Sequence, residues 1–408
     1  MAETLSPSSL AELEQAVAWA LSAERPLAVT GRGSKRGLGA PVDASAELRL
    51  DRMAGIDLYE PAELVMSAGA GTPLVEIEAT LAERHQELAF EPADYGLILG
   101  GAANQQSVGG TFACNLSGPR RLKAGAARDH LLGVHCVTGL GQAIKTGGRV
   151  MKNVTGYDLC KLLTGSYGTL AVMGRLTFKV MPAAPDAATL LLRGDDVALL
   201  LEALRTAMGT SCDVAGAAVL PAAAAARSGV PAVAAAGSAL AALRVEGPEN
   251  SVRYRLDALE RVVARRLGLD ATRLDRAATR ALWREIRDVR LLDPALPVLW
   301  RASVPPTEAA GLAAGVAPLE PELLFDWSGG LVWIAHRRAD GDAGATLVRG
   351  SLGTAGGHAT LVRAPEAARR ATPPFQPQPA LLQGLSQRVK SSFDPKGILN
   401  PGRMYPGF

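Results

Sequence analysis

The sequence predicts an α+β fold with at least two domains, and three observations support this prediction. The chain has 408 residues, which is more than a single hydrophobic core usually organises. Segments with strand and helix patterns alternate in its first part. Sixteen of its 44 glycines lie between Tyr95 and Arg175, and Pro182, Pro185 and Asp186 then indicate a domain boundary.

Charge and composition exclude several classes of protein. Lys and Arg number 43 and Asp and Glu 40, and a net charge of +3 is too small to indicate a nucleic-acid partner. Apolar residues at 48% and charged residues at 20% are typical of a globular protein, which excludes disorder and a fibrous repeat. We find neither a signal-peptide pattern nor an apolar run of about 20 residues that would span a membrane. The sequence therefore predicts a cytoplasmic protein, and docking on a membrane complex stays open.

The first elements follow from capping and turn residues. Ser9 and Glu12 have capping-box spacing and predict a helix that starts at Leu10. Thr72 and Pro73 predict the cap and the first residue of a second helix. The other predicted elements are strands at 27–30, 64–68, 168–180, 331–335 and 358–362, a hairpin at 133–148, and helices at 155–163, 195–208, 250–267 and 379–393.

Familiar nucleotide, hydrolase and metal signatures are absent. A Rossmann loop after residues 27–30 would need a third glycine where Arg36 stands, and the pair Gly139 and Gly141 is followed by Ile144 instead of a third glycine. The sequence contains neither a P-loop nor a G-x-S-x-G nucleophile motif. Its four cysteines lack C-x-x-C spacing and its five histidines lack metal-ligand spacing, so we expect neither an iron–sulfur cluster nor a metal.

Three glycine-rich elements nevertheless favour a ligand that contains phosphate. Residues 31–35 (G-R-G-S-K) directly follow a predicted strand, and successive backbone N–H groups in such a turn can bind a diphosphate. Alone, this loop is equally well explained as an exposed turn. Residues 107–118 (S-V-G-G-T-F-A-C-N-L-S-G) form the second element, and residues 152–158 with 162–172 form the third. Together they are difficult to explain as chance turns.

At these residues the sequence resembles the FAD-binding domain of the vanillyl-alcohol-oxidase superfamily, also called the PCMH-type domain. The resemblance covers about residues 1–181 and the tail at 394–403, where D-P-K-G-I-L-N-P-G matches a frequent family ending. It implies a two-lobed FAD-binding domain at 1–181, a smaller α+β cap or substrate domain at 182–376, and a C-terminal helix and tail at 377–408 that return to the FAD. Residues 150–159, 326–330 and 356–360 are similar to the FAD-binding subunits of bacterial glycolate oxidase complexes.

The resemblance also implies which residues contact the cofactor. The first loop would bind the diphosphate, the second element the ribityl and isoalloxazine side, and the third the adenine end. In that order these residues are Gly31, Arg32, Gly33, Ser34 and Lys35; Gly109, Gly110, Asn115, Ser117 and Gly118; and Gly168, Thr169 and Val172. Some relatives attach the flavin through a histidine in the first loop. Because no histidine lies between Val29 and Val42, we expect FAD to be noncovalent.

The substrate machinery departs from the family pattern. Catalytic 2-hydroxyacid dehydrogenases of the superfamily contain an H-x-G-D-G-N-x-H element, whereas the nearest stretch here, 336–342, has no second histidine in register. Oxidation of a hydroxy acid needs a cation for the carboxylate and a base for the hydroxyl. The sequence offers Arg301, Arg337 and Arg363 as cations and His358 as a base, with His358 and Arg363 the catalytic candidates.

The leading hypothesis is an FAD-binding subunit of a multisubunit glycolate (2-hydroxyacid) oxidase or dehydrogenase. Because it has no cluster cysteines, it would pass electrons to an iron–sulfur partner subunit, or else to a quinone or a soluble acceptor. A sister FAD-linked subunit would belong to the same complex. The tryptophans of the second domain would form a docking surface or belong to its core. Two alternatives stay open: an assembly subunit whose flavin is structural, and a stand-alone FAD-linked alcohol oxidase.

Overall fold

The computed structural model describes residues 3–150, 156–354 and 356–407. It divides the chain into two compact units: unit 1 comprises Met1–Ser117, Gly125–Ala183 and Pro377–Phe408, and unit 2 comprises Gly118–Ala124 and Ala184–Gln376. We expected the divisions after residues 181 and 376, and we did not anticipate that Gly118–Ala124 belongs to unit 2. We call this short stretch the excursion segment. Residues 152–155 of the third glycine-rich element lie outside the described residues.

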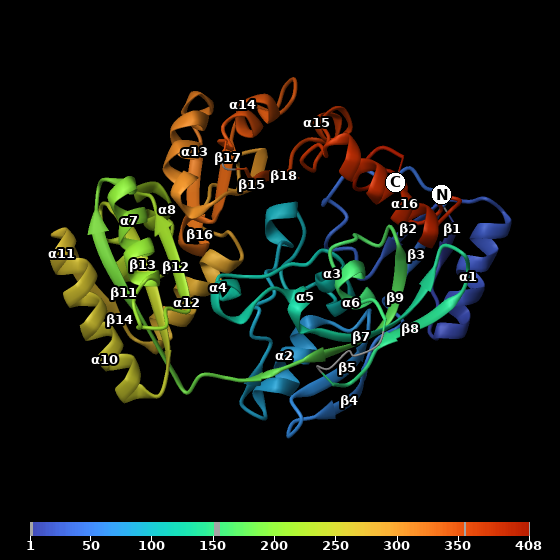
Figure 1. Ribbon diagram of the computed structural model, residues 1–408, viewed down its shortest axis with the longest axis horizontal. Helices are drawn as coiled ribbons and strands as arrows, with labels where there is room; N and C mark the ends of the chain where they lie inside the picture. Colours follow the sequence, from blue (N-terminus) through green and yellow to red (C-terminus); the bar gives the residue numbers. More distant parts are fainter. Residues whose placement is uncertain (1–2, 151–155, 355, 408) are drawn as a thin grey trace. The chain divides into compact units, whose positions relative to one another are not determined.

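Unit 1 combines small sheets with mostly short helices (Figure 1). Its elements are β1 (Glu3–Leu5), α1 (Leu10–Ser22), β2 (Leu27–Thr30), β3 (Ala46–Arg49), β4 (Ile56–Glu60), β5 (Val65–Gly69), α2 (Leu74–Ala82), β6 (Gln86–Glu87), α3 (Val108–Ala113), α5 (Ala127–His130), β7 (Leu131–Thr138), β8 (Ala143–Gly147), α6 (Leu159–Leu163), β9 (Ala171–Lys179), β10 (Met181–Pro182) and α16 (Ala380–Phe393). Strands β1-β3-β2 form a parallel sheet, β4-β5-β9-β7-β8 an antiparallel sheet, and β10-β6 a short pair.

Helices α1 and α2 differ at their starts, since a side chain caps α1 but not α2. Ser9 caps α1 as predicted, because its hydroxyl accepts a hydrogen bond from the Glu12 amide at 3.2 Å. The prediction that Thr72 caps α2 is wrong, since Pro73 occupies that position. The Thr72 hydroxyl instead donates to the carbonyl of Gly69 at 2.7 Å. A hydroxyl next to a glycine turn thus stabilises the turn instead of the helix.

Unit 2 is built on one antiparallel sheet of eight strands in the order β14-β11-β13-β12-β16-β17-β15-β18. Its elements are α4 (Arg121–Ala124), β11 (Asp186–Gly194), α7 (Val197–Met208), β12 (Gly216–Leu220), α8 (Ala222–Ala226), α9 (Pro231–Ala234), β13 (Ala239–Gly247), α10 (Glu249–Leu259), α11 (Arg265–Leu267), β14 (Asp270–Leu274), α12 (Arg276–Arg287), β15 (Val298–Ser303), α13 (Ala309–Val316), β16 (Glu322–Asp326), β17 (Leu331–His336), α14 (Ala345–Gly350), β18 (His358–Arg363) and α15 (Glu366–Ala371). The helix predicted at 250–267 is interrupted, because a π-helical turn at Glu260–Ala264 separates α10 from α11.

The two faces of this sheet differ in character. Helices α7, α10 and α13 contribute to an apolar core on one face, into which β15 sends Val298, Trp300 and Ala302. Because side chains alternate along a strand, Arg301 and Ser303 point to the opposite face. Polar and charged side chains of β15 therefore lie on the face away from that core.

Helix α16 corresponds to the helix predicted at 379–393 and belongs to unit 1. Leu381, Leu382 and Leu385 of its apolar face are exposed, while Val389 and Phe393 pack against the unit 1 core. Throughout the described ranges, no helix is both long and apolar enough to cross a membrane.

Candidate functional site

Unit 1 contains a cleft at the end of β2 that is open to solvent. Nine of the thirteen predicted cofactor residues line it: Gly31, Arg32, Gly33, Ser34, Lys35, Gly109, Gly110, Gly168 and Val172. The lining also includes Val29, Thr30, Arg36, Leu50, Ala70, Ser107, Ala113, Cys114, Tyr167, Ala171, Met173, Asn400 and Arg403. Elements that are distant in the sequence thus surround one space.

The loop after β2 depends on glycine at two positions. A Cβ at Gly31 would lie 2.3 Å from the Ser107 hydroxyl oxygen, so a side chain there would displace this hydroxyl from the Gly110 amide that it caps. Gly33 has φ +81°, a backbone conformation that disfavours other residues. The sequence therefore folds here into a tight turn whose backbone faces the cleft.

Lys35 supplies a buried cation to the cleft. Its side chain is 8% exposed, and Nζ donates to Gln106 Oε1 at 3.2 Å. Burial lowers the pKa of Lys35 to about 8, because the ammonium group loses hydration. An anion in the cleft would restore the lost stabilisation of the charged form, which is the chemistry that a diphosphate provides.

Four predicted cofactor residues do not line the cleft. Asn115 accepts the Arg128 amide at 3.0 Å, and the Ser117 hydroxyl accepts the Ala127 amide at 2.9 Å. Gly118 belongs to unit 2, where its carbonyl accepts a hydrogen bond from Trp327. The Thr169 hydroxyl donates to the carbonyl of Ser166 at 2.7 Å. Their assignment to the cofactor remains a prediction, and the structure gives each of these groups a structural partner.

The tail after α16 contributes two cleft residues that we did not predict. The side-chain oxygen of Asn400 accepts the Val29 amide at 2.8 Å, and its nitrogen donates to the carbonyl of Tyr167 at 2.8 Å. The Arg403 guanidinium donates to the carbonyl of Lys35 at 2.9 Å. Asn400 therefore links two cleft-lining elements, and Arg403 supports the glycine loop. The D-P-K-G-I-L-N-P-G motif was the available signal, since it contains Asn400.

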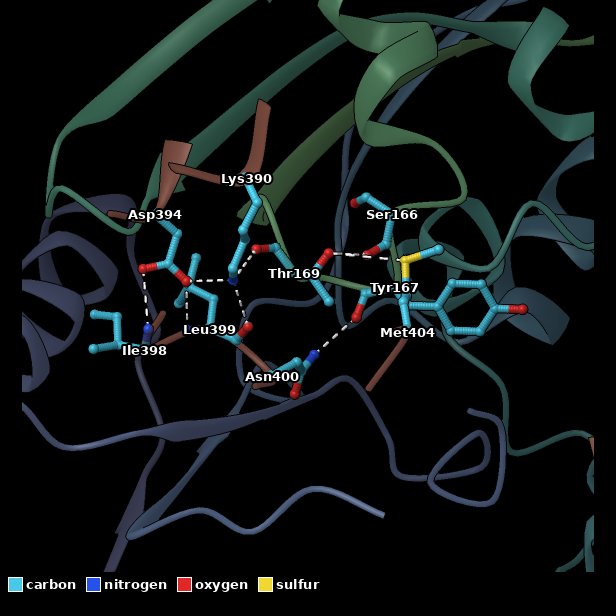
Figure 2. Close-up of polar contacts among 9 residues, drawn as sticks. All are labelled: Ser166, Tyr167, Thr169, Lys390, Asp394, Ile398, Leu399, Asn400 and Met404. Carbon is cyan, nitrogen blue, oxygen red and sulfur yellow. Dashed lines mark hydrogen bonds and ion pairs between the residues drawn. The ribbon is translucent and has the colours of Figure 1, made fainter. Parts of the chain in front are cut away.

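A buried ion pair holds this tail in place (Figure 2). Lys390 Nζ donates to Asp394 at 2.6 Å, to the Thr169 carbonyl at 2.7 Å and to the Leu399 carbonyl at 3.2 Å. The Asp394 carboxylate accepts the amides of Ile398 and Leu399 at 3.0 and 2.8 Å. Burial lowers the pKa of Lys390, and the Asp394 charge opposes that shift. The network fastens the tail to the backbone of Thr169, beside the cleft residue Gly168.

The catalytic candidates of unit 2 lie at opposite ends of β18. His358 begins the strand and is exposed, whereas Arg363 ends it and donates to the Leu296 carbonyl at 2.6 Å. No group of three or more His, Cys, Asp or Glu side chains suited to a metal occurs among the residues that the structure describes. His336, in the stretch nearest to the family's metal element, is fully buried.

The glycine turn and the buried ammonium group of the cleft are donors that would suit the diphosphate of a dinucleotide. Gly31 lies close to the Ser107 side chain, and Lys35 and Arg403 line the cleft at the same loop. The chemistry of a flavin dinucleotide agrees with these donors. Fold and cleft together define an FAD-dependent oxidoreductase of the PCMH type.

Comparisons with known proteins identify the family. A family model described as "FAD binding domain" matches residues 2–147. The chain is 35% identical to the glycolate oxidase subunit GlcE of Escherichia coli over 401 residues, 97% of each chain. It is 36% identical to the glycolate oxidase subunit GlcD of Bacillus subtilis over 116 residues, 28% of this chain and 23% of that one. The chain belongs to the GlcE family of FAD-linked oxidoreductases.

A solved structure has the same fold. The 4-ethylphenol oxidase from Gulosibacter chungangensis superposes with a TM-score of 0.70, and the match covers 99% of this chain and 89% of that chain at 15% identity. At this identity the likeness concerns the fold alone.

Proposed function

We propose that the chain is the FAD-binding subunit of a multisubunit glycolate (2-hydroxyacid) oxidase or dehydrogenase. The observation that supports it most is the cleft of unit 1, where the glycine loop, Lys35 and Arg403 meet. The names of the E. coli and B. subtilis relatives add the substrate class and the subunit organisation. FAD, when bound, supplies an acceptor for the two electrons and the proton that leave the hydroxy-acid carbon as hydride.

Within this proposal the residues of the chain bind and orient the cofactor. The Lys35 ammonium group would donate hydrogen bonds to the diphosphate of bound FAD. Asn400 holds β2 and the turn at Tyr167 together. The binding is noncovalent, because no described residue that lines the cleft is a histidine. Burial raises the pKa of the Cys114 thiol, which keeps this lining residue protonated and unreactive at neutral pH.

The electrons then pass to an iron–sulfur partner subunit, with a sister FAD-linked subunit in the same complex. The protein acts in the cytoplasm and reaches the inner membrane only through those partners. The four cysteines of the chain support a separate cluster subunit, since they lack cluster spacing.

Two experiments test these steps. Acid denaturation of the purified chain should release all the flavin into the supernatant, and colour retained in the pellet would contradict noncovalent binding. Anaerobic mixing of the FAD-containing chain with glycolate, in the absence of the sister FAD-linked subunit, should bleach its flavin absorbance. A chain that contains FAD but does not bleach would favour the assembly-subunit alternative. Peroxide release by the chain alone would favour the stand-alone oxidase.

A further inference from the structure

Two arginines of unit 2 lie over one tryptophan ring. Trp327 directly follows β16, and its side chain is buried. The Arg121 guanidinium carbon lies 4.4 Å from the Trp327 ring centroid, and that of Arg301 lies 4.9 Å from it. Both distances are within the range of a cation–π interaction. One indole thus orients two planar cations that come from distant parts of the sequence.

The backbone under this ring is in a costly conformation. Trp327 and Ser328 have φ values of 51° and 57°, in the left-handed region that bulky residues avoid. Two consecutive residues of this kind persist only where the surroundings hold them, and such positions concentrate at functional sites. The Ser328 hydroxyl is buried and lacks a hydrogen-bond partner among the described residues.

The excursion segment is fixed so that Arg121 reaches the ring. Arg120 forms an ion pair with Glu246 of β13 at 3.0 Å, with side chains 15% and 10% exposed. Trp327 Nε1 donates to the Gly118 carbonyl at 3.1 Å. Arg120 therefore anchors the segment, while the neighbouring Arg121 is exposed and stacks on the indole.

Two strands place His358 beside these arginines. Ser303 of β15 pairs with His358 of β18, and Arg301 pairs with Thr360, so Arg301 and His358 lie on the same face of the sheet. Partial desolvation of the ring and the charges of Arg301 and Arg121 lower the pKa of His358, which favours its neutral form. Within the described part of the chain, Arg301 has no carboxylate partner. The cluster therefore combines two cations with a neutral hydrogen-bond acceptor and lacks a compensating anion at Arg301.

We propose that Arg121 and Arg301 bind the carboxylate of a small 2-hydroxy acid on unit 2. His358 accepts the hydrogen bond of the substrate hydroxyl. We call these three residues with Trp327 the arginine cluster. The inference rests on the proposed function, because the hydroxyl role assumes a hydroxy-acid substrate. Guanidinium groups bind carboxylates through parallel N–H···O bonds, and the indole limits how far either arginine can turn away.

Titration of the full, FAD-containing chain with oxalate tests the carboxylate site directly, because oxalate offers carboxylates and has no Cα–H to lose. Arg301→Met and Arg121→Met should each raise the oxalate dissociation constant by about 10- to 100-fold. Arg301→Lys should recover only part of the affinity, since an ammonium group lacks the planar fork. Arg337→Met is the matched control, because it removes an exposed arginine of the same unit and should change nothing. Ethylene glycol, an uncharged analogue of glycolate, should not bind.

The outcomes separate this inference from the proposed function. FAD content and melting temperature should stay at the parental values in every variant. Unchanged values would exclude the possibility that a substitution weakens oxalate binding only by disturbing the fold. If Arg301→Met and Arg121→Met bind oxalate as tightly as Arg337→Met does, the carboxylate site is refuted, even where glycolate still bleaches the flavin. If oxalate binds through the arginines but the complex holds no FAD, the proposed function fails and the anion site stands.

Discussion

The cleft of unit 1 and the arginine cluster of unit 2 differ in how they are built. The cleft consists largely of backbone and small side chains, with Lys35 buried among them. The arginine cluster consists of long side chains that converge on the Trp327 ring from the excursion segment and a strand of the large sheet. The cleft holds its shape through glycine conformation and the cluster through side-chain stacking. Substitution of glycines in the cleft should therefore weaken cofactor binding, whereas removal of charged side chains from the cluster should weaken the binding of small anions.

The largest effect should come from the ion pair that fastens the tail. Lys390→Met leaves the Asp394 carboxylate buried without its cation, and the loss of one partner from such a pair costs about 3–5 kcal/mol of unfolding free energy. Chemical denaturation measures this change. Lys396→Met removes an exposed lysine paired with Glu24 and should leave the denaturation midpoint unchanged. Equal stability of the two variants would show that the tail does not contribute to the unit 1 structure.

The next effect tests whether the cleft depends on backbone conformation. Gly33→Val places a β-branched residue at φ +81°, where strain of about 1–3 kcal/mol should distort the loop and reduce bound FAD about fivefold or more. Gly100→Val is the matched control, since Gly100 has φ +80° and a Cβ added there would meet no atom within 4 Å. The flavin-to-protein absorbance ratio gives the result. If Gly33→Val still binds FAD stoichiometrically, the assignment of residues 31–35 to the diphosphate is wrong.

A smaller effect should appear as pH dependence. In the free cleft the pKa of Lys35 is about 8, whereas in the unfolded chain it is 10.5. Between these two pH values the unfolded chain binds more protons than the folded chain, so the free energy of unfolding without FAD rises with pH. A bound diphosphate favours the charged form, so FAD affinity should be constant below about pH 8 and fall by up to about tenfold per pH unit above it. Fluorescence titration of FAD measures this. Lys35→Met should bind more weakly and without that slope; a slope that persists in Lys35→Met would assign it to another group.

The smallest effect on flavin content is expected for a substitution in unit 2 that lies outside both regions. His336 is fully buried in unit 2 and lies outside both the cleft and the arginine cluster. His336→Ala should therefore leave flavin content unchanged, as measured by the absorbance ratio of the purified protein. Loss of flavin in this variant would mean that cofactor binding depends on the packing of unit 2.

The sequence predicted the cleft better than the cluster, for a physical reason. Residues 31–35 and 109–110 are short continuous segments whose glycines can be recognised without knowledge of the fold, although only 31–35 form a turn and 109–110 lie in helix α3. Arg403 and Asn400 reach the same cleft only through tertiary packing, and they were missed. Arg301 and His358 were candidates by residue type, but only strand register places them on one face. Arg121 was unpredictable because nothing local indicates that residues 118–124 leave unit 1.

The chain order of the cleft has a consequence for biosynthesis. Its glycine loop is translated early, yet Asn400 and Arg403 are translated only after all of residues 184–376. While a ribosome is still making unit 2, the nascent unit 1 lacks the side chains that tie β2 to the Tyr167 turn. Flavin loading should therefore follow the emergence of unit 2, and a nascent chain arrested before residue 394 should not retain the cofactor.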